Sequence, residues 1–124
     1  MILIKIFILS LLFNIIWEFL HAKLYLHYKG GLITNRVLLR ASFVDALFIT
    51  AMSIFFVNFS YLSSHLWWAI IFGFIASWLL EKYALKNNRW KYKDSMPIIP
   101  ILKTGLTPTV QIGLIAWLVY LILI

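Results

Sequence analysis

Residues 66–80 read LWWAIIFGFIASWLL and contain no charged side chain. Extended by His65 at one end and by Glu81–Leu85 at the other, this stretch is long enough for a membrane-spanning helix, which needs about 20 residues to cross about 30 Å of hydrocarbon. Three more apolar stretches have the same character: Ile2–Leu20, Ala41–Phe59 and Pro108–Ile124. We therefore expect an all-α fold, a polytopic membrane protein whose single transmembrane domain is a four-helix bundle.

The composition agrees with this reading. Of the 124 residues, 64% are hydrophobic and 12% are charged, and the mean hydropathy is +0.96. A soluble domain is usually about 25% charged and about 45–50% apolar. These values exclude a soluble enzyme, a disordered chain and an ordinary nucleic-acid-binding domain. The chain has no cysteine, which excludes disulfides and thiolate metal sites.

The spans are expected at about residues 2–24, 38–59, 65–85 and 106–124, with inner loops at 25–37 and 86–105. Thr107 is suited to cap the fourth helix, and Pro108 to occupy its first position, where a missing N–H costs nothing. The alternative for this span is a proline-kinked helix that begins near Leu102.

The basic residues predict the orientation of the spans. Of the 11 Lys and Arg residues, all except Lys5 fall between the first and second apolar stretches or between the third and fourth, and Ser60–Ser64 has none. Because basic loops stay in the cytoplasm, we expect both termini outside and a multi-pass protein of the cell inner (plasma) membrane. The net charge of +7 then reflects topology and contact with anionic membrane lipids, not nucleic acid.

Three of the four acidic residues, Glu18, Asp45 and Glu81, lie inside predicted spans. Each is five positions from a basic residue that marks the cytoplasmic boundary, which corresponds to a depth of about 7.5 Å. A carboxylate at membrane depth costs several kcal/mol and usually faces the interior of a bundle. The matched depths predict a polar pocket that opens to the cytoplasmic side.

Other polar residues fall near these carboxylates. Asn14, Glu18, His21 and Tyr25 are spaced by three or four positions and share one helix face. Gln111 lies at a similar depth on the fourth span. The candidate catalytic residues are therefore Glu18, Asp45, Glu81 and His21, and Asn14 and Gln111 are candidate substrate-binding residues.

Structural roles are the alternative for each carboxylate. Glu81 could extend to the interface as a helix-end charge beside Lys82. Glu18 and His21 could form a purely structural pair between helices. Asp45 could pair with Arg40 near the surface.

The second inner loop begins KNNRWKYKDSMPIIPIL over residues 86–102. Its mixture of cations and aromatic residues is typical of a segment at the level of the lipid headgroups. One interpretation is a lid over the pocket, in which Arg89 or a lysine holds a phosphate or carboxylate. The alternative is a membrane-anchored connector. Arg89, Trp90 and Tyr92 are further candidate substrate-binding residues.

A metal site is a further possibility. The pair Glu18-x-x-His21 matches the carboxylate–histidine spacing of di-metal helix bundles. Asp45 and Glu81 could complete an oxygen-rich site for zinc, iron or manganese. Such a site normally needs two pairs and the chain has one, so no metal is favoured and the cofactor stays open.

The pattern Glu81…Arg89-Trp90-x-Tyr92-x-x-x-Met96-Pro97-x-x-Pro100…Gly105-Leu106-x-Pro108-x-x-Gln111 resembles small four-span bacterial membrane proteins of unknown function. The resemblance covers the C-terminal third and brings no activity with it. It implies that one site contains Glu81, Arg89, Trp90, Tyr92, Pro97, Pro108 and Gln111. In size the chain also resembles small multidrug transporters, which have four spans and a carboxylate in the first.

The sequence leaves three functions open. The preferred one is a membrane-embedded enzyme or binding protein for a lipid-like substrate, an isoprenoid or a phospholipid. In it, Glu18 or Asp45 is the general acid or base and His21 or Asn14 orients it. The alternative is a small proton- or cation-coupled transporter that works as a homo-oligomer. The third is a structural subunit that binds a partner through the face of Gly73 and Ser77.

Overall fold

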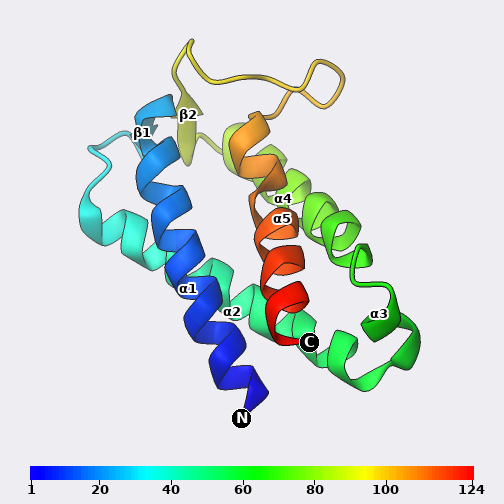
Figure 1. Cartoon of the computed structure of the whole chain (residues 1–124). Helices are drawn as coiled ribbons and strands as arrows, with labels where there is room; N and C mark the ends of the chain where they lie inside the picture. Colours follow the sequence, from blue (N-terminus) through cyan, green and yellow to red (C-terminus); the bar gives the residue numbers. More distant parts are fainter.

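The computed structural model describes residues 1–124 and contains four long helices with a small sheet at one end (Figure 1). The elements are α1 (Ile2–His21), a 3₁₀ turn (Ala22–Leu24), β1 (Tyr25–Tyr28), α2 (Asn35–Asn58), α3 (Ser60–Ser64), α4 (Trp68–Lys86), β2 (Trp90–Tyr92) and α5 (Leu106–Leu123). α1 with the 3₁₀ turn, α2, α4 and α5 are each long and apolar enough to cross a membrane. The prediction of an all-α membrane protein with a four-helix bundle is confirmed.

Two helices begin at positions that hydropathy alone does not mark. α2 begins at Asn35 rather than at residue 38, because the Thr34 hydroxyl accepts a hydrogen bond from the Val37 N–H (3.3 Å) and caps the helix. α4 begins at Trp68 rather than at residue 65. Local capping and turns therefore determine these ends.

The fourth span starts where it was expected, near residue 106, but its predicted cap is wrong. α5 begins at Leu106 with Gly105 at its cap, and Thr107 does not cap it. Pro108 still lies in the first turn, where helix N–H groups have no intrahelical acceptor. A helix that begins near Leu102 is not formed either, since this part of the chain turns back and Ile98 pairs with Gly105.

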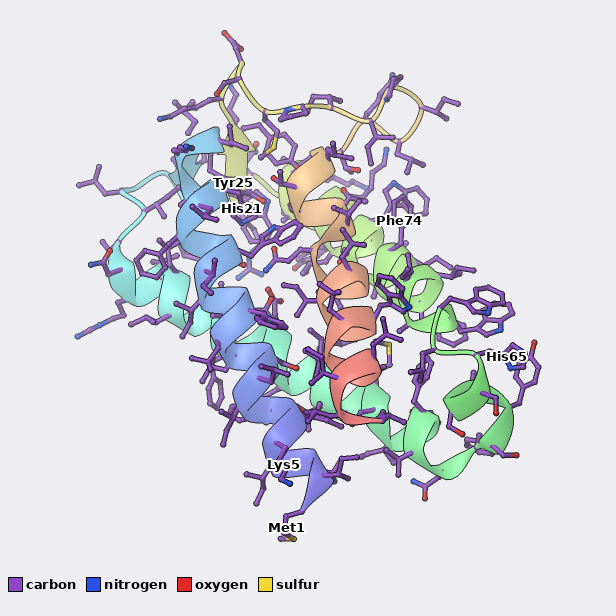
Figure 2. The ribbon with its side chains drawn as sticks, in the orientation of Figure 1. Met1, Lys5, His21, Tyr25, His65 and Phe74 are labelled. Atoms are coloured by element: carbon purple, nitrogen blue, oxygen red, sulfur yellow. The ribbon has the colours of Figure 1, made fainter.

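α5 lies at the centre of the bundle. α1 packs against α2 and α5, and α4 packs against α5, whereas the backbones of α2 and α4 rarely come close and side chains such as Phe56 and Phe72 meet between them. The apolar core fills the end of the bundle that carries both termini, opposite the sheet (Figure 1). Tyr120 is fully buried there, and its hydroxyl donates to the Ile49 carbonyl. Lys5 lies at this end and His21 at the other (Figure 2).

A pair of glycines sets the approach of α4 to α5. A Cβ added at Gly73 would overlap the backbone of Gly113, and one added at Gly113 would lie 2.6 Å from the Ile70 carbonyl oxygen. Small residues of this kind let helix backbones come into direct contact in a membrane. The two helices therefore pack as one close pair.

The two basic loops, at residues 25–37 and 86–105, pair with each other. β1 and β2 are antiparallel, with Tyr28 opposite Trp90 and Tyr25 opposite Tyr92. The sequence predicted a headgroup-level segment at residues 86–102 and no strands, because each strand is very short and its partner is distant in the chain. The sheet ties the end of α1 to the end of α4.

Replacement of Gly73 by Ala is expected to lower the free energy of unfolding by about 1–3 kcal/mol, because the added methyl group forces two backbones apart. The measurement is thermal or chemical unfolding of the purified protein in detergent. Gly31→Ala is the matched control, since a Cβ there meets only the Tyr28 carbonyl oxygen at 3.7 Å. Equal stability of Gly73→Ala and Gly31→Ala would contradict the close helix contact.

Candidate functional site

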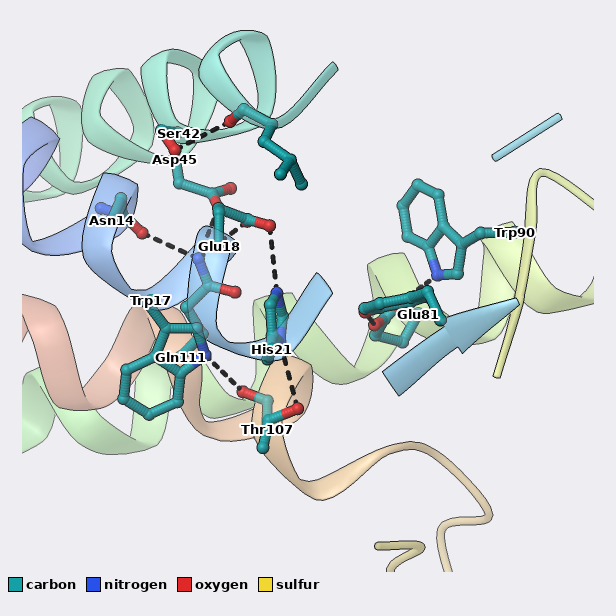
Figure 3. Close-up of polar contacts among 12 residues, drawn as sticks. Asn14, Trp17, Glu18, His21, Ser42, Asp45, Glu81, Trp90, Thr107 and Gln111 are labelled. Atoms are coloured by element: carbon teal, nitrogen blue, oxygen red, sulfur yellow. Dashed lines mark hydrogen bonds and ion pairs between the residues drawn. The ribbon is translucent and has the colours of Figure 1, made fainter. Parts of the chain in front are cut away.

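The amide of Gln111 joins three helices at the sheet end of the bundle (Figure 3). Its Nε2 lies 2.9 Å from Asn14 Oδ1, 2.9 Å from Glu18 Oε1 and 3.0 Å from Asp45 Oδ2. Asn14 and Glu18 come from α1, Asp45 from α2 and Gln111 from α5. The amide nitrogen carries two hydrogens and faces three oxygens. At most two of the three contacts are therefore hydrogen bonds at one time.

His21 contacts the other oxygen of Glu18. Its Nε2 lies 3.0 Å from Glu18 Oε2, and its Nδ1 lies 3.1 Å from the Thr107 hydroxyl. Trp17 Nε1 donates to the Thr107 carbonyl (3.2 Å) and holds the first turn of α5 against α1. Glu18 and His21 therefore pair within α1, not between helices as the structural alternative had it, and Gln111 Nε2 links Glu18 to Asp45.

Glu81 has its own donors. The Tyr25 hydroxyl donates to Oε1 (2.7 Å) and Trp90 Nε1 donates to Oε2 (2.6 Å). The residue is only 2% exposed, which rules out the alternative of a charge that extends to the interface from the helix end. Burial and the nearby Glu81 charge raise the pKa of Tyr25 well above its usual value, so Tyr25 remains a donor at neutral pH.

Tyr92 lies beside this group without a hydrogen bond of its own. Its ring is 5.3 Å from the ring of Tyr25, and its hydroxyl has no partner. Burial and the negative charge of Glu81 raise the pKa of Tyr92 as well. Tyr92 therefore contributes packing to the wall around Glu81.

A cavity of about 320 Å³ lies between α2 and α4, where the two helices leave a gap. Val44 and Leu80 line the cavity and are also 54% and 47% exposed, so the cavity opens sideways between the helices. Its polar lining includes Glu18, His21, Asp45, Glu81, Arg89, Trp90 and Gln111. An apolar side opening thus leads to buried carboxylates.

Two of the predicted site residues, Asn14 and Tyr92, do not line the cavity. Asn14 still contacts the Gln111 amide. Asp45 forms no ion pair with Arg40 and contacts Gln111 instead, since the only ion pair in the structure is Glu18–His21.

The residues considered for a metal do not form a metal-binding group. No three His, Asp or Glu side chains are placed to share an ion. Glu81 is occupied by Tyr25 and Trp90, and Glu18 by His21 and Gln111. The arrangement fits hydrogen-bonded acid and base groups.

Sequence reasoning missed several residues of the site. Tyr25 stood in the polar stripe with His21 but was not assigned to the site, and it reaches Glu81 only because β1 turns away from α1. Thr107 was assigned to a helix cap. Arg40 was read as a boundary marker, yet it lines the cavity. For Arg40 the available signal was its position five residues before Asp45, for Tyr25 its place on the helix face of Glu18 and His21, and for Thr107 its spacing of four from Gln111.

Comparison with known proteins identifies no relative: no protein-family model, no curated protein and no solved structure matches this chain. The chemistry of the cavity is therefore inferred from its own side chains. The fold and site define a polytopic membrane protein with a cavity that joins an apolar side opening to a hydrogen-bonded carboxylate cluster.

Gln111→Leu is expected to destabilise the protein by about 1–3 kcal/mol, because acceptor oxygens on α1 and α2 lose their donor. The measurement is the free energy of unfolding in detergent. Asp45→Asn in the Gln111→Leu background should recover part of the loss, because it removes a group that can only accept. If Gln111→Leu matches the wild type, Gln111 does not hold the helices together.

Tyr25→Phe removes one donor from a buried carboxylate and is expected to lower the free energy of unfolding by about 1.5–3 kcal/mol. Tyr92→Phe is the matched control, since its hydroxyl has no partner, and the change should be close to neutral. Unfolding of both variants is compared in the same detergent. A larger loss for Tyr92→Phe than for Tyr25→Phe would contradict the described contacts of Glu81.

Proposed function

We propose that this protein is a membrane-embedded enzyme or binding protein for a lipid-like substrate, an isoprenoid or a phospholipid, on which it acts by acid/base chemistry. The observation that carries the proposal is the cavity between α2 and α4. Its exposed apolar residues Val44 and Leu80 face the side of the bundle, and Glu18, Asp45 and Gln111 line it within. This combination suits an amphiphile that enters from the bilayer.

The walls of the cavity support a division between tail and head. The apolar tail would lie between α2 and α4, against side chains such as Val44, Leu80 and Ile112. The polar head would lie under β1 and β2, near Arg89. In this proposal the two strands serve as the lid, and Trp90 anchors the lid to Glu81.

The cluster around Gln111 supports acid/base chemistry. Three acceptor oxygens surround an amide nitrogen with two hydrogens, and a proton on Glu18 or Asp45 completes the hydrogen bonds. That proton is the one a general acid would deliver. His21 contacts Glu18, and because the Thr107 hydroxyl can donate or accept, the imidazole can take up or return a proton at Glu18 Oε2.

The orientation with both termini outside belongs to this proposal. The two termini lie at one end of the bundle, and the sheet built from the basic inner loops lies at the other (Figure 1). Basic segments stay on the cytoplasmic side. In a bacterial inner membrane the cavity would then lie near the cytoplasmic surface.

The packing favours this function over the two alternatives. A coupled transporter needs a polar path across the membrane, and the terminal half of the bundle is a packed core that includes Ile6, Ile49, Phe56 and Tyr120. A structural subunit was expected to bind a partner through Gly73 and Ser77. Gly73 instead meets Gly113 of the same chain.

Native mass spectrometry with lipid analysis of the purified protein tests the proposal. We expect one amphiphile bound per chain in the wild type. Leu80→Trp fills the cavity and should abolish that peak, whereas Leu79→Trp on the same helix faces away from the cavity and should retain it. Bound lipid in both variants, or in neither, would argue against the cavity as the binding site.

Lipid binding measured in this way, together with complementation of a deletion strain, separates substrate binding from acid/base chemistry. Glu18→Gln and Asp45→Asn should retain the bound lipid and fail to complement a deletion strain. If Glu18→Gln, Asp45→Asn and Glu81→Gln all complement fully, the acid/base role is refuted.

A further inference from the structure

The charged groups that line the cavity differ in whether they have hydrogen-bond or ion-pair partners within the protein. Glu18, Asp45 and Glu81 each contact at least one hydrogen-bond donor of the protein. Arg40 and Arg89 line the same cavity, yet neither guanidinium forms an ion pair or a hydrogen bond. Each carboxylate of the site thus contacts a donor of the protein, whereas the exposed Arg40 and the half-buried Arg89 have no ion-pair partner in the protein.

The two arginines come from opposite sides of the gap. Arg40 belongs to α2, five positions before Asp45, and Arg89 follows the end of α4. The backbone of Arg89 is held at both ends, since its N–H donates to the Ala84 carbonyl (2.9 Å) and its carbonyl accepts from the Lys29 N–H. Its guanidinium lies 5.9 Å from the centre of the Tyr83 ring. The site thus presents one arginine from each wall.

A third donor faces the cavity without a partner. Ser77 is 2% exposed and lines the cavity, and its hydroxyl makes no hydrogen bond. It lies one helical turn before Glu81 and so deeper in the bundle. A buried polar group usually has a partner, and a ligand oxygen would supply one here. Arg40 and Arg89 therefore call for a negatively charged group that is rich in acceptors, and the Ser77 hydroxyl offers a separate hydrogen-bond site deeper in the cavity.

We propose that Arg40 and Arg89 together bind the phosphate group of an amphiphile whose chain lies between α2 and α4. This inference rests on the proposed function and specifies its substrate class. A carboxylate offers two oxygens and one negative charge, whereas a phosphate monoester offers three terminal oxygens and up to two charges, so the monoester is the better match for two guanidinium groups. The cavity carboxylates do not occupy the arginines, because they contact Gln111, His21, Tyr25 and Trp90.

Isothermal titration calorimetry of the full chain in a phosphate-free maltoside detergent tests this inference. The probes are dodecyl phosphate, dodecanol and inorganic phosphate. We expect the wild type to bind dodecyl phosphate at least about tenfold more tightly than the other two, since hydrogen bonds to charged groups are each worth a factor of this order. Arg40→Gln and Arg89→Gln should each lose about tenfold. Arg36→Gln, on the same helix but outside the cavity, should bind as the wild type does.

The three probes distinguish failure of the phosphate site from failure of the proposed lipid-binding function. Equal binding of dodecanol and dodecyl phosphate, or unchanged binding in Arg40→Gln and Arg89→Gln, would overturn the phosphate site and leave the proposed lipid-binding function intact. Inorganic phosphate bound as tightly as dodecyl phosphate would overturn the amphiphile and indicate a soluble phosphate compound. Absence of binding by both dodecyl compounds would overturn the proposed function itself.

Discussion

The contact of one amide nitrogen with three oxygens holds the polar end of this molecule together. Gln111 Nε2 reaches Asn14, Glu18 and Asp45, and so links the central helix α5 to α1 and α2. Buried carboxylates and amides are costly at membrane depth unless they are paired. The other polar contacts extend from this point: His21 holds the second oxygen of Glu18, and Thr107 holds His21. The position of the first turn of α5 thus determines the geometry of the carboxylates.

The position of the cavity follows from how closely each helix approaches α5. Gly73 and Gly113 bring α4 into backbone contact with α5, while Gln111 connects α5 to the opposite pair, α1 and α2. α4 and α2 are thereby held on different sides of α5, and their backbones rarely come close. The gap between them is closed by packed apolar residues at the terminal end and by β1 and β2 at the other. What remains open is a side entrance beside the carboxylates.

Much of the architecture could be predicted from local patterns. Hydropathy located four helices, because the length of an apolar run reflects the thickness of the bilayer. Helical spacing placed Asn14, Glu18 and His21 on one face, where the structure has them in contact with one cluster. The matched depths of the carboxylates did not predict that Glu81 has its own donors. Those donors, Tyr25 and Trp90, come from β1 and β2, two paired strands that are separated in the sequence by α2, α3 and α4.

The sequence by itself determined the membrane environment, the number of spans and the presence of three carboxylates within them, because composition and spacing along a helix are local properties. Only the tertiary structure decided which donors those carboxylates receive, that Arg40 and Arg89 line the same cavity, and that the cavity opens between α2 and α4. Hydrogen-bond matching, strand pairing and close helix contact join residues far apart in the chain. No local pattern specifies these contacts, since each depends on the relative positions of several helices at once.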